Sequence, residues 1–115
     1  MSLFDTAAPN PAGYRDVTVA DVAVPAKGFR MVDVREPEEF KGELGHIPGA
    51  ELVPLGTVMA HAPGWNKDEP LLLICKVGGR SGHAAQALHR MGFSKVMNLV
   101  GGMLAWNAAG KITEK

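Results

Sequence analysis

Four consecutive apolar residues, Leu71 to Ile74, constrain the fold of this chain more than any other feature of the sequence. A run this short with no polar member is typical of a strand that is buried on both faces, as in the interior of a parallel sheet. Parallel strands need crossover connections, usually helices, and these cover the two faces of the sheet. The run therefore predicts an α/β fold in which residues 71–74 form a central strand.

Other short apolar runs alternate with stretches of helical character along the chain. The clearest helix contains Ala84, Leu88 and Met91, which share one face at the i, i+4, i+7 spacing of an amphipathic helix. Gly92 follows it directly and is typical of a left-handed helix cap. Alternating strands and helices indicate a parallel sheet with helical connections. The expected strands are 31–34, 50–53, 71–74 and 95–99, and the expected helices are 36–42, 55–61, 81–91 and 103–108.

The length of 115 residues suits one domain with a hydrophobic core of its own. Residues 1–15 contain Pro9, Pro11 and Gly13 and show no periodic apolar pattern. We therefore expect residues 1–15 to form a flexible N-terminal arm and residues 16–115 to form a single domain.

The charge balance and the cysteine count exclude several classes of protein. Lys plus Arg number 12 and Asp plus Glu number 12, so no excess positive charge attracts nucleic acid or an anionic membrane. No apolar run approaches the roughly 20 residues that cross a bilayer. The single cysteine fits a reducing compartment, and residues 1–11 lack the pattern of a secretory signal. We expect a cytoplasmic protein with no nucleic-acid or membrane partner, and the sequence leaves its oligomeric state open.

The cysteine, Cys75, directly follows the buried strand and begins the loop Cys-Lys-Val-Gly-Gly-Arg-Ser. Paired glycines permit a tight turn that directs backbone N–H groups inward, and the start of the next helix adds partial positive charge. Lys76 and Arg80 add full charges. These features favour the thiolate, which is the reactive form of cysteine, and they favour a persulfide anion equally. We expect Cys75 to be the catalytic nucleophile and the substrate to be bound by Lys76, Val77, Gly78, Gly79, Arg80 and Ser81.

Plainer interpretations compete for the same residues. A lone cysteine after apolar residues is most often a small core residue, although a core position does not need a cationic, glycine-rich loop beside it. Asp33 and Arg35, at a strand end, are interpreted as supporting residues that shape the pocket, and contact of Arg35 with an anion is the alternative. The four histidines lack ligand spacing, so we expect no metal and no cofactor. Helix geometry turns His83 away from Cys75.

Four short segments resemble, in this order, motifs of the rhodanese family. The family motifs are a D-V-R strand end with a following acidic–aromatic pair, an H-I-P-G-A turn, the loop C-x-x-G-x-R-S and the element G-G-x-x-A-W. The matching residues are Asp33–Arg35 with Glu39-Phe40, His46–Ala50, Cys75–Ser81 and Gly101–Trp106. The resemblance covers roughly residues 15 to 110 and implies a central five-stranded parallel sheet with helices on both faces.

The same resemblance implies a sulfurtransferase. Cys75 would accept sulfur from a donor such as thiosulfate or a persulfide, and pass it to cyanide, a cellular thiol or an acceptor protein. Tyrosine-phosphatase loops are one residue longer than the segment between Cys75 and Arg80, so this ring is expected to suit one sulfur atom better than a phosphate. A cysteine phosphatase of the same fold and a sulfur-carrier or regulatory binding module are the alternatives. Val77 stands where two-domain thiosulfate enzymes have a basic residue, which leaves open both the donor and the ranking of Lys76 and Arg80 in binding it.

Overall fold

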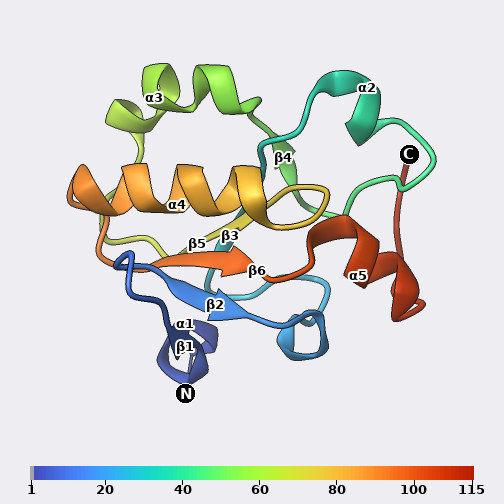
Figure 1. Ribbon diagram of the computed structural model, residues 1–115, viewed down its shortest axis with the longest axis horizontal. Coiled ribbons are helices and arrows are strands. Elements are labelled where there is room, and N and C mark those ends of the chain that lie inside the picture. The colour runs from blue at the N-terminus through green and yellow to red at the C-terminus, as the bar shows by residue number, and fades with distance from the viewer. Residues whose placement is uncertain (1) are drawn as a thin grey trace.

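The computed structural model describes residues 2–115 and contains a six-stranded sheet in the order β1-β2-β6-β5-β3-β4 (Figure 1). β1 pairs antiparallel with β2, and the other pairings within this sheet are parallel. The α/β fold with a parallel sheet is confirmed, and the sheet has one strand more than expected because β1 adds to its edge. The strands are β1 (Ala8–Pro9), β2 (Arg15–Val17), β3 (Arg30–Asp33), β4 (Glu51–Leu52), β5 (Leu71–Ile74) and β6 (Val96–Leu99).

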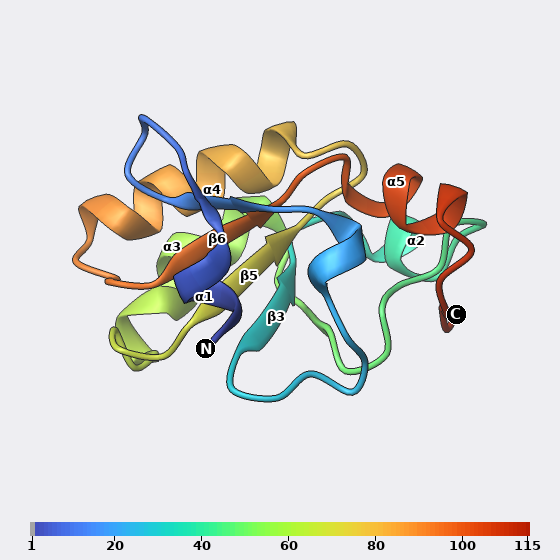
Figure 2. The same ribbon diagram turned by 90° about the horizontal axis from the view of Figure 1, so that it is seen from below.

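Helices and short 3-10 turns connect the strands. The α-helices are α1 (Leu3–Thr6), α2 (Pro37–Phe40), α3 (Val58–His61), α4 (Gly79–Arg90) and α5 (Gly102–Ala108), and the 3-10 helices are η1 (Val19–Asp21), η2 (Leu55–Thr57) and η3 (Ala62–Gly64). Figure 1 shows α4 running alongside β5 and β6, with α5 following the end of β6. α2 and α5 lie at the same end of the molecule in both views (Figure 1, Figure 2).

Alternate residues of β5 supply the hydrophobic core on the two faces of the sheet. Leu71 and Leu73 belong to a cluster with residues of α3 and α4, whereas Leu72 and Ile74 belong to a second cluster with residues of α5. All four residues are fully buried. Burying a leucine or isoleucine side chain contributes about 1.5–3 kcal/mol. Burial on both faces explains why the run contains no polar residue.

The N-terminal segment, for which a flexible arm was expected, contains secondary structure, and its flexibility stays a prediction. Ser2 and Asp5 form a capping box at the start of α1, and β1 pairs with β2. Phe4 packs against the core, and its carbonyl oxygen accepts a hydrogen bond of 2.7 Å from the first residue of β2. A single capped turn is too short to produce apolar periodicity, so the sequence pattern did not indicate it. Met1 lies outside the described residues, and the domain boundary at 15/16 stays a prediction.

Some boundaries also differ from the expected ones. β2 is absent from the sequence prediction because its first two residues are polar, and it is held by parallel pairing with β6. The helix expected at 55–61 is divided into η2 and α3, and α4 begins two residues early, at Gly79. In residues 2–115 the longest helix is α4, with 12 residues, and no helix there has the length and apolarity needed to cross a membrane.

The parallel pairing of β3, β5 and β6 brings their carboxyl ends to one edge of the sheet. Ligands of open α/β sheets bind at this edge. The residues that follow these three strands are the segment after Asp33, the loop that starts at Cys75, and Gly101-Gly102 at the start of α5. The fold therefore brings together three of the four motifs that the sequence analysis identified.

Candidate active site at the end of β5

The loop between β5 and α4 is bent by Gly78. This glycine has φ 110° and forms the N-cap of α4, a left-handed conformation that strains residues with a side chain. The bend directs the N–H of Gly78 to the sulfur of Cys75, where it donates a hydrogen bond with an N···Sγ distance of 2.9 Å. The structure thus places an inward-facing amide where the paired glycines predicted one.

The sulfur of Cys75 is buried but surrounded by hydrogen-bond donors. The hydroxyl oxygen of Ser81 lies 3.3 Å from Sγ. Burial raises the pKa of the Cys75 thiol. Hydrogen bonds to the sulfur lower the pKa by more than burial raises it, so the pKa lies below its ordinary value of 9.0. The donors responsible are the Ser81 side chain and the backbone N–H groups of Ser81, Gly78 and Val77. The loop therefore favours the thiolate mainly through hydrogen bonds rather than through the full charges of its cations.

Arg80 is engaged in an ion pair with a residue of α2. Its guanidinium donates two hydrogen bonds to the Glu39 carboxylate, at 2.6 and 2.7 Å. The hydrogen bond from Arg80 lowers the pKa of Glu39 to about 2, and the same contact raises the pKa of Arg80. The sequence analysis noted Glu39 only as part of a motif and expected Arg80 to add a full positive charge to the substrate site. The structure differs, because Glu39 offsets that charge and ties the cysteine loop to α2.

Arg35 and Asp33 form a second ion pair, which is buried. The guanidinium of Arg35 is 1% exposed and donates to both carboxylate oxygens of Asp33, with Nη2 2.8 Å from Oδ2. It also donates to the carbonyl oxygens of Gly45 at 2.7 Å and Glu39 at 3.2 Å. These contacts connect the end of β3 to α2 and to the segment after it. They favour the interpretation of Asp33 and Arg35 as residues that shape the site.

The first turn of α5 supports the cysteine loop from the other side. The N–H of Met103 donates to the carbonyl of Cys75 at 2.9 Å, and the N–H of Leu104 donates to the carbonyl of Lys76 at 3.0 Å. Gly102 makes this approach possible: it has φ 51°, and a Cβ there would lie 2.3 Å from the Cys75 carbonyl oxygen. Gly102, the second glycine of the G-G-x-x-A-W motif, is thus needed for close packing against the cysteine loop.

Asn98 is a site residue that the sequence analysis missed. It lies in β6, is 6% exposed, and contacts both Ser81 and Gly78 through its side-chain amide. The signal that would have found it is a single amide within the otherwise apolar strand Val96–Leu99, because a buried polar side chain requires partners.

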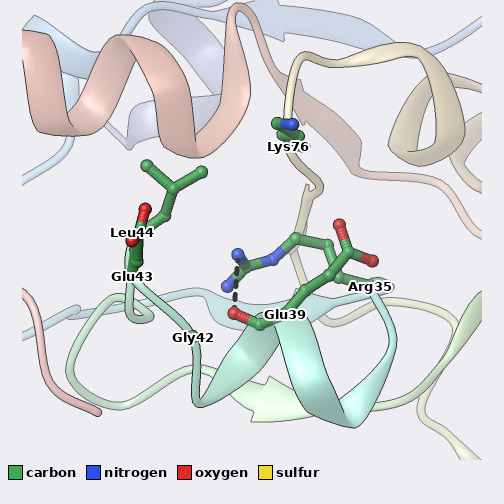
Figure 3. A pocket seen from close by; sticks show the side chains of 6 residues that line it. All are labelled: Arg35, Glu39, Gly42, Glu43, Leu44 and Lys76. Atoms are coloured by element: carbon green, nitrogen blue, oxygen red, sulfur yellow. Dashed lines mark hydrogen bonds between the residues drawn. The ribbon is translucent and has the colours of Figure 1, made fainter.

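A pocket of about 210 Å³ opens beside the loop, between α2 and Lys76. Lys76 lies across the pocket from Arg35 and Glu39, as Figure 3 shows. Lys76 is exposed and, within the part of the chain that the structure describes, makes no salt bridge. It is therefore the cation of the loop whose charge is available to a bound anion. The lining residues are Arg35, Glu39, Gly42, Glu43, Leu44 and Lys76.

The histidines lie apart from the sulfur. His83 is exposed on α4, and His46 contacts the carbonyl of Phe40 through its Nδ1 at 2.9 Å. Among residues 2–115 no three side chains of His, Cys, Asp or Glu are grouped as metal ligands would be. The hydrogen-bond donors that lower the pKa of Cys75 thus come from its own loop and from the start of α4, and no histidine is among them.

Comparison with protein families and sequences gives a consistent result. The family described as "Rhodanese-like domain" matches residues 18–109. The chain is 42% identical over 91 residues to the protein YqhL of Bacillus subtilis, covering 76% of this chain and 69% of YqhL. It is 33% identical over 79 residues to the thiosulfate sulfurtransferase GlpE of Pseudoalteromonas translucida, covering 69% of this chain and 73% of GlpE. Some relatives are longer, and the chain spans 42% of Bacillus subtilis YrkF.

Solved structures with the same architecture include a rhodanese-like domain protein from Staphylococcus aureus. It superimposes with a TM-score of 0.73 at 30% identity, over 87% of this chain and 98% of that one. A protein from Rhodopseudomonas palustris, described as of unknown function and a possible tyrosine phosphatase, has a TM-score of 0.80 at 27% identity. The match covers 97% of this chain and 91% of that protein.

Proposed function

The chain belongs to the rhodanese-like domain family, and on that premise we propose that it is a sulfurtransferase that carries sulfur as a persulfide on Cys75. The observation that carries the proposal is the set of hydrogen-bond donors around Sγ of Cys75. Sγ accepts a hydrogen bond from the N–H of Gly78 and lies 3.3 Å from the hydroxyl oxygen of Ser81. Such a ring of donors stabilises a sulfur anion in a buried place. The sulfurtransferase name of one relative supports the same reaction class.

The proposed reaction has two half-reactions. In the first, the Cys75 thiolate attacks the outer sulfur of thiosulfate or a persulfide; the new S–S bond forms while the donor S–S bond breaks, and the leaving group departs with the electron pair. In the second, cyanide or a thiolate attacks the outer sulfur, and the electron pair of the broken bond returns to Cys75. No proton has to move if the thiol is already ionised. Cys75 is the single cysteine, so the acceptor comes from outside the chain.

In this proposal each residue of the cysteine loop has a different role. Lys76 holds the anionic part of the donor, since its charge is free. The N–H groups of Val77, Gly78 and Ser81 hold the sulfur anion, and Arg80 keeps the loop in place through Glu39. Because Cys75 is buried, a donor reaches the sulfur when the loop around it opens. Asp33 and Arg35 support that arrangement.

Acceptor and location follow from the same chemistry. A persulfide passes its sulfur most directly to a thiol, either of a small molecule or of an acceptor protein, and thiols persist in a reducing compartment. We therefore include a cytoplasmic location and a thiol acceptor in the proposal.

The experiment that tests the activity measures thiocyanate formed from thiosulfate and cyanide. The proposal expects parallel double-reciprocal plots, the signature of a persulfide intermediate, and loss of the activity in Cys75→Ser. Circular dichroism of Cys75→Ser serves as the folding control. Turnover that survives in the folded variant would exclude Cys75 as the sulfur carrier.

A cysteine phosphatase is the second candidate, favoured by the similarity to the Rhodopseudomonas protein. The shorter loop argues against it, because donors arranged around one sulfur atom lie at the wrong distances for a phosphate. The same preparation should therefore leave an aryl phosphate intact. Cys75-dependent hydrolysis of that ester, with no thiocyanate formed, would make the phosphatase the better interpretation.

A further inference from the structure

Asn98 is the one polar residue of β6, and both ends of its amide face the cysteine loop. Its Nδ2 donates to the carbonyl of Gly78 at 3.3 Å, and its Oδ1 lies 2.5 Å from the hydroxyl oxygen of Ser81. With only 6% of the residue exposed, water does not replace these partners. A leucine or valine would suit a strand buried in this way, so the amide has a role that involves the loop.

The orientation of that amide is fixed by its partners. The carbonyl of Gly78 only accepts hydrogen bonds, so Nδ2 must face it and Oδ1 must face Ser81. The same carbonyl also receives the N–H of Gly82 at 3.0 Å, which occupies its second lone pair. The oxygen of Asn98 is therefore held next to the hydroxyl of Ser81.

The Ser81 hydroxyl has a single hydrogen to donate, and two acceptors near it are free to receive that hydrogen. Oδ1 of Asn98 lies 2.5 Å from the Ser81 oxygen, and Sγ of Cys75 lies 3.3 Å from it. A serine hydroxyl rotates freely and donates to one acceptor at a time. The Gly78 carbonyl, at 3.3 Å, is already occupied by its two N–H donors.

We propose that Asn98 is a positioning residue that competes with Cys75 for the hydrogen of Ser81 and thereby favours the sulfur-loaded state over the free thiolate. The proposal rests on the sulfurtransferase function above. The free thiolate draws the hydrogen to Sγ. When the thiolate attacks thiosulfate, its electron pair becomes the new S–S bond, the donor S–S bond breaks with its electron pair leaving on sulfite, and the negative charge of the resulting persulfide lies on the outer sulfur. Sγ is then a weak acceptor, and the hydrogen returns to Oδ1 of Asn98.

The test of this proposal compares variants of Ser81 and Asn98, and these variants leave the other titratable groups near the sulfur unchanged. These groups are Lys76 on the loop, the Arg80–Glu39 pair, the Asp33–Arg35 pair and Tyr14, whose hydroxyl lies beside Gly82. Burial raises the pKa of Tyr14 above 10.0, outside the range in which the thiol titrates. Differences between the variants below therefore report the Ser81 hydroxyl.

The test is the pH dependence of thiol alkylation in four proteins: the natural chain, Ser81→Ala, Asn98→Ala and the double variant. We expect Ser81→Ala to raise the pKa of Cys75 by about one unit, because a hydrogen bond to the thiolate is lost. Asn98→Ala should lower it by about half a unit, because the hydroxyl then donates to sulfur without competition. The double variant should match Ser81→Ala. A raised pKa in Asn98→Ala, or a shift that persists without the hydroxyl, would overturn the proposal.

Two further measurements keep the proposal testable if the Asn98→Ala variant misfolds. Asn98→Leu keeps the side-chain volume and should shift the pKa in the same direction as Asn98→Ala. In the natural protein, the ¹³C signal of the Asn98 side-chain carbonyl should titrate with Cys75, and at least half of that change should vanish in Ser81→Ala. A signal that stays flat across the ionisation of Cys75 would overturn the proposal without any Asn98 variant.

Sulfur loading distinguishes this proposal from the function on which it rests. At limiting thiosulfate, Asn98→Ala should hold about half or less of the persulfide that the natural chain holds, measured by intact mass. If the function itself is wrong, no form of the chain gains sulfur, whereas equal loading of both forms contradicts the role of Asn98 alone.

Discussion

Lys76 and Arg80 are both cations of the cysteine loop, but their surroundings give their charges different uses. The guanidinium of Arg80 is bound to Glu39 at 2.6 and 2.7 Å, whereas Lys76 borders an open pocket. An ion pair holds a loop in place, and an unpaired ammonium attracts an anion. The sequence analysis left the ranking of the two residues in donor binding open, and the contacts favour Lys76.

Lys76→Ala should therefore raise KM for thiosulfate by about fivefold to tenfold, which corresponds to the loss of one charge-assisted contact. Its free energy of unfolding should change by no more than about 0.5 kcal/mol, since the side chain is exposed. Lys27→Ala, an exposed lysine outside the loop, is the matched control and should leave KM unchanged. Steady-state kinetics at low and high salt give the comparison. An unchanged KM in Lys76→Ala would remove Lys76 from the donor site.

At the scale of elements, the site depends on how α2 and α5 hold the loop between β5 and α4. α2 does so through the ion pair of Glu39 with Arg80, and α5 does so through N–H groups that reach the carbonyls of Cys75 and Lys76. Neither contact is local in sequence. The first depends on a carboxylate whose charge varies with pH, and the second on a glycine that lets two backbones meet, so each can be tested separately.

The Glu39–Arg80 pair predicts a loss of stability in acid. The folded chain lowers the pKa of Glu39 from 4.5 to about 2, so the ionised carboxylate favours folding. Its contribution is complete above pH 4.5 and is lost as the pH falls from 4.5 towards 2. Urea unfolding should show the natural chain more stable than Glu39→Gln near pH 6, with the difference shrinking below pH 4.5.

Glu43→Gln supplies the control for that experiment, because Glu43 lines the same pocket and makes no salt bridge among residues 2–115. The difference in free energy of unfolding between Glu43→Gln and the natural chain should vary less with pH than the difference for Glu39→Gln. A Glu39→Gln difference that stays constant from pH 6 to 3 would show that the pair does not contribute as an ion pair.

The contact of α5 with the cysteine loop predicts a large effect at Gly102. Gly102→Ala should lower the free energy of unfolding by about 3 kcal/mol, since the new Cβ would lie 2.3 Å from the Cys75 carbonyl oxygen in a left-handed backbone. Gly110→Ala should cost only about 1–2 kcal/mol, because Gly110 has φ 70° but nothing within 4 Å of its Cβ position. Equal losses by chemical denaturation would mean that the close approach carries no cost.

Across the whole molecule, the sequence predicts what depends on local pattern and buried faces. The apolar run at 71–74 predicted β5 with the correct bounds, and the alternation of elements predicted the parallel sheet. β2 was missed because its polar residues are held by pairing with β6, which no local pattern expresses. Long-range pairing of this kind explains the missed strand, whereas the short helix α1 was missed because a single turn leaves no periodic pattern.

In the candidate site too, features set by one segment could be predicted from the sequence, and contacts between distant segments could not. The position of Cys75 at the end of β5 and the glycine bend after it were predicted from one segment, because the loop is contiguous in the chain. The ion pair of Arg80 with Glu39 joins residues 41 positions apart, and Asn98 reaches Ser81 from 17 positions away. Such partners become visible only when the sheet brings the strand ends together.

The most direct test of the account is the intact mass of the chain before and after contact with a sulfur donor. After incubation with thiosulfate and removal of excess reagent, the account predicts an added mass of one sulfur atom. That mass should be absent in Cys75→Ser and should disappear when cyanide or a thiol is added, with one thiocyanate or persulfide released per sulfur lost. A folded, reduced chain that gains no sulfur from thiosulfate or from a small-molecule persulfide would contradict the account.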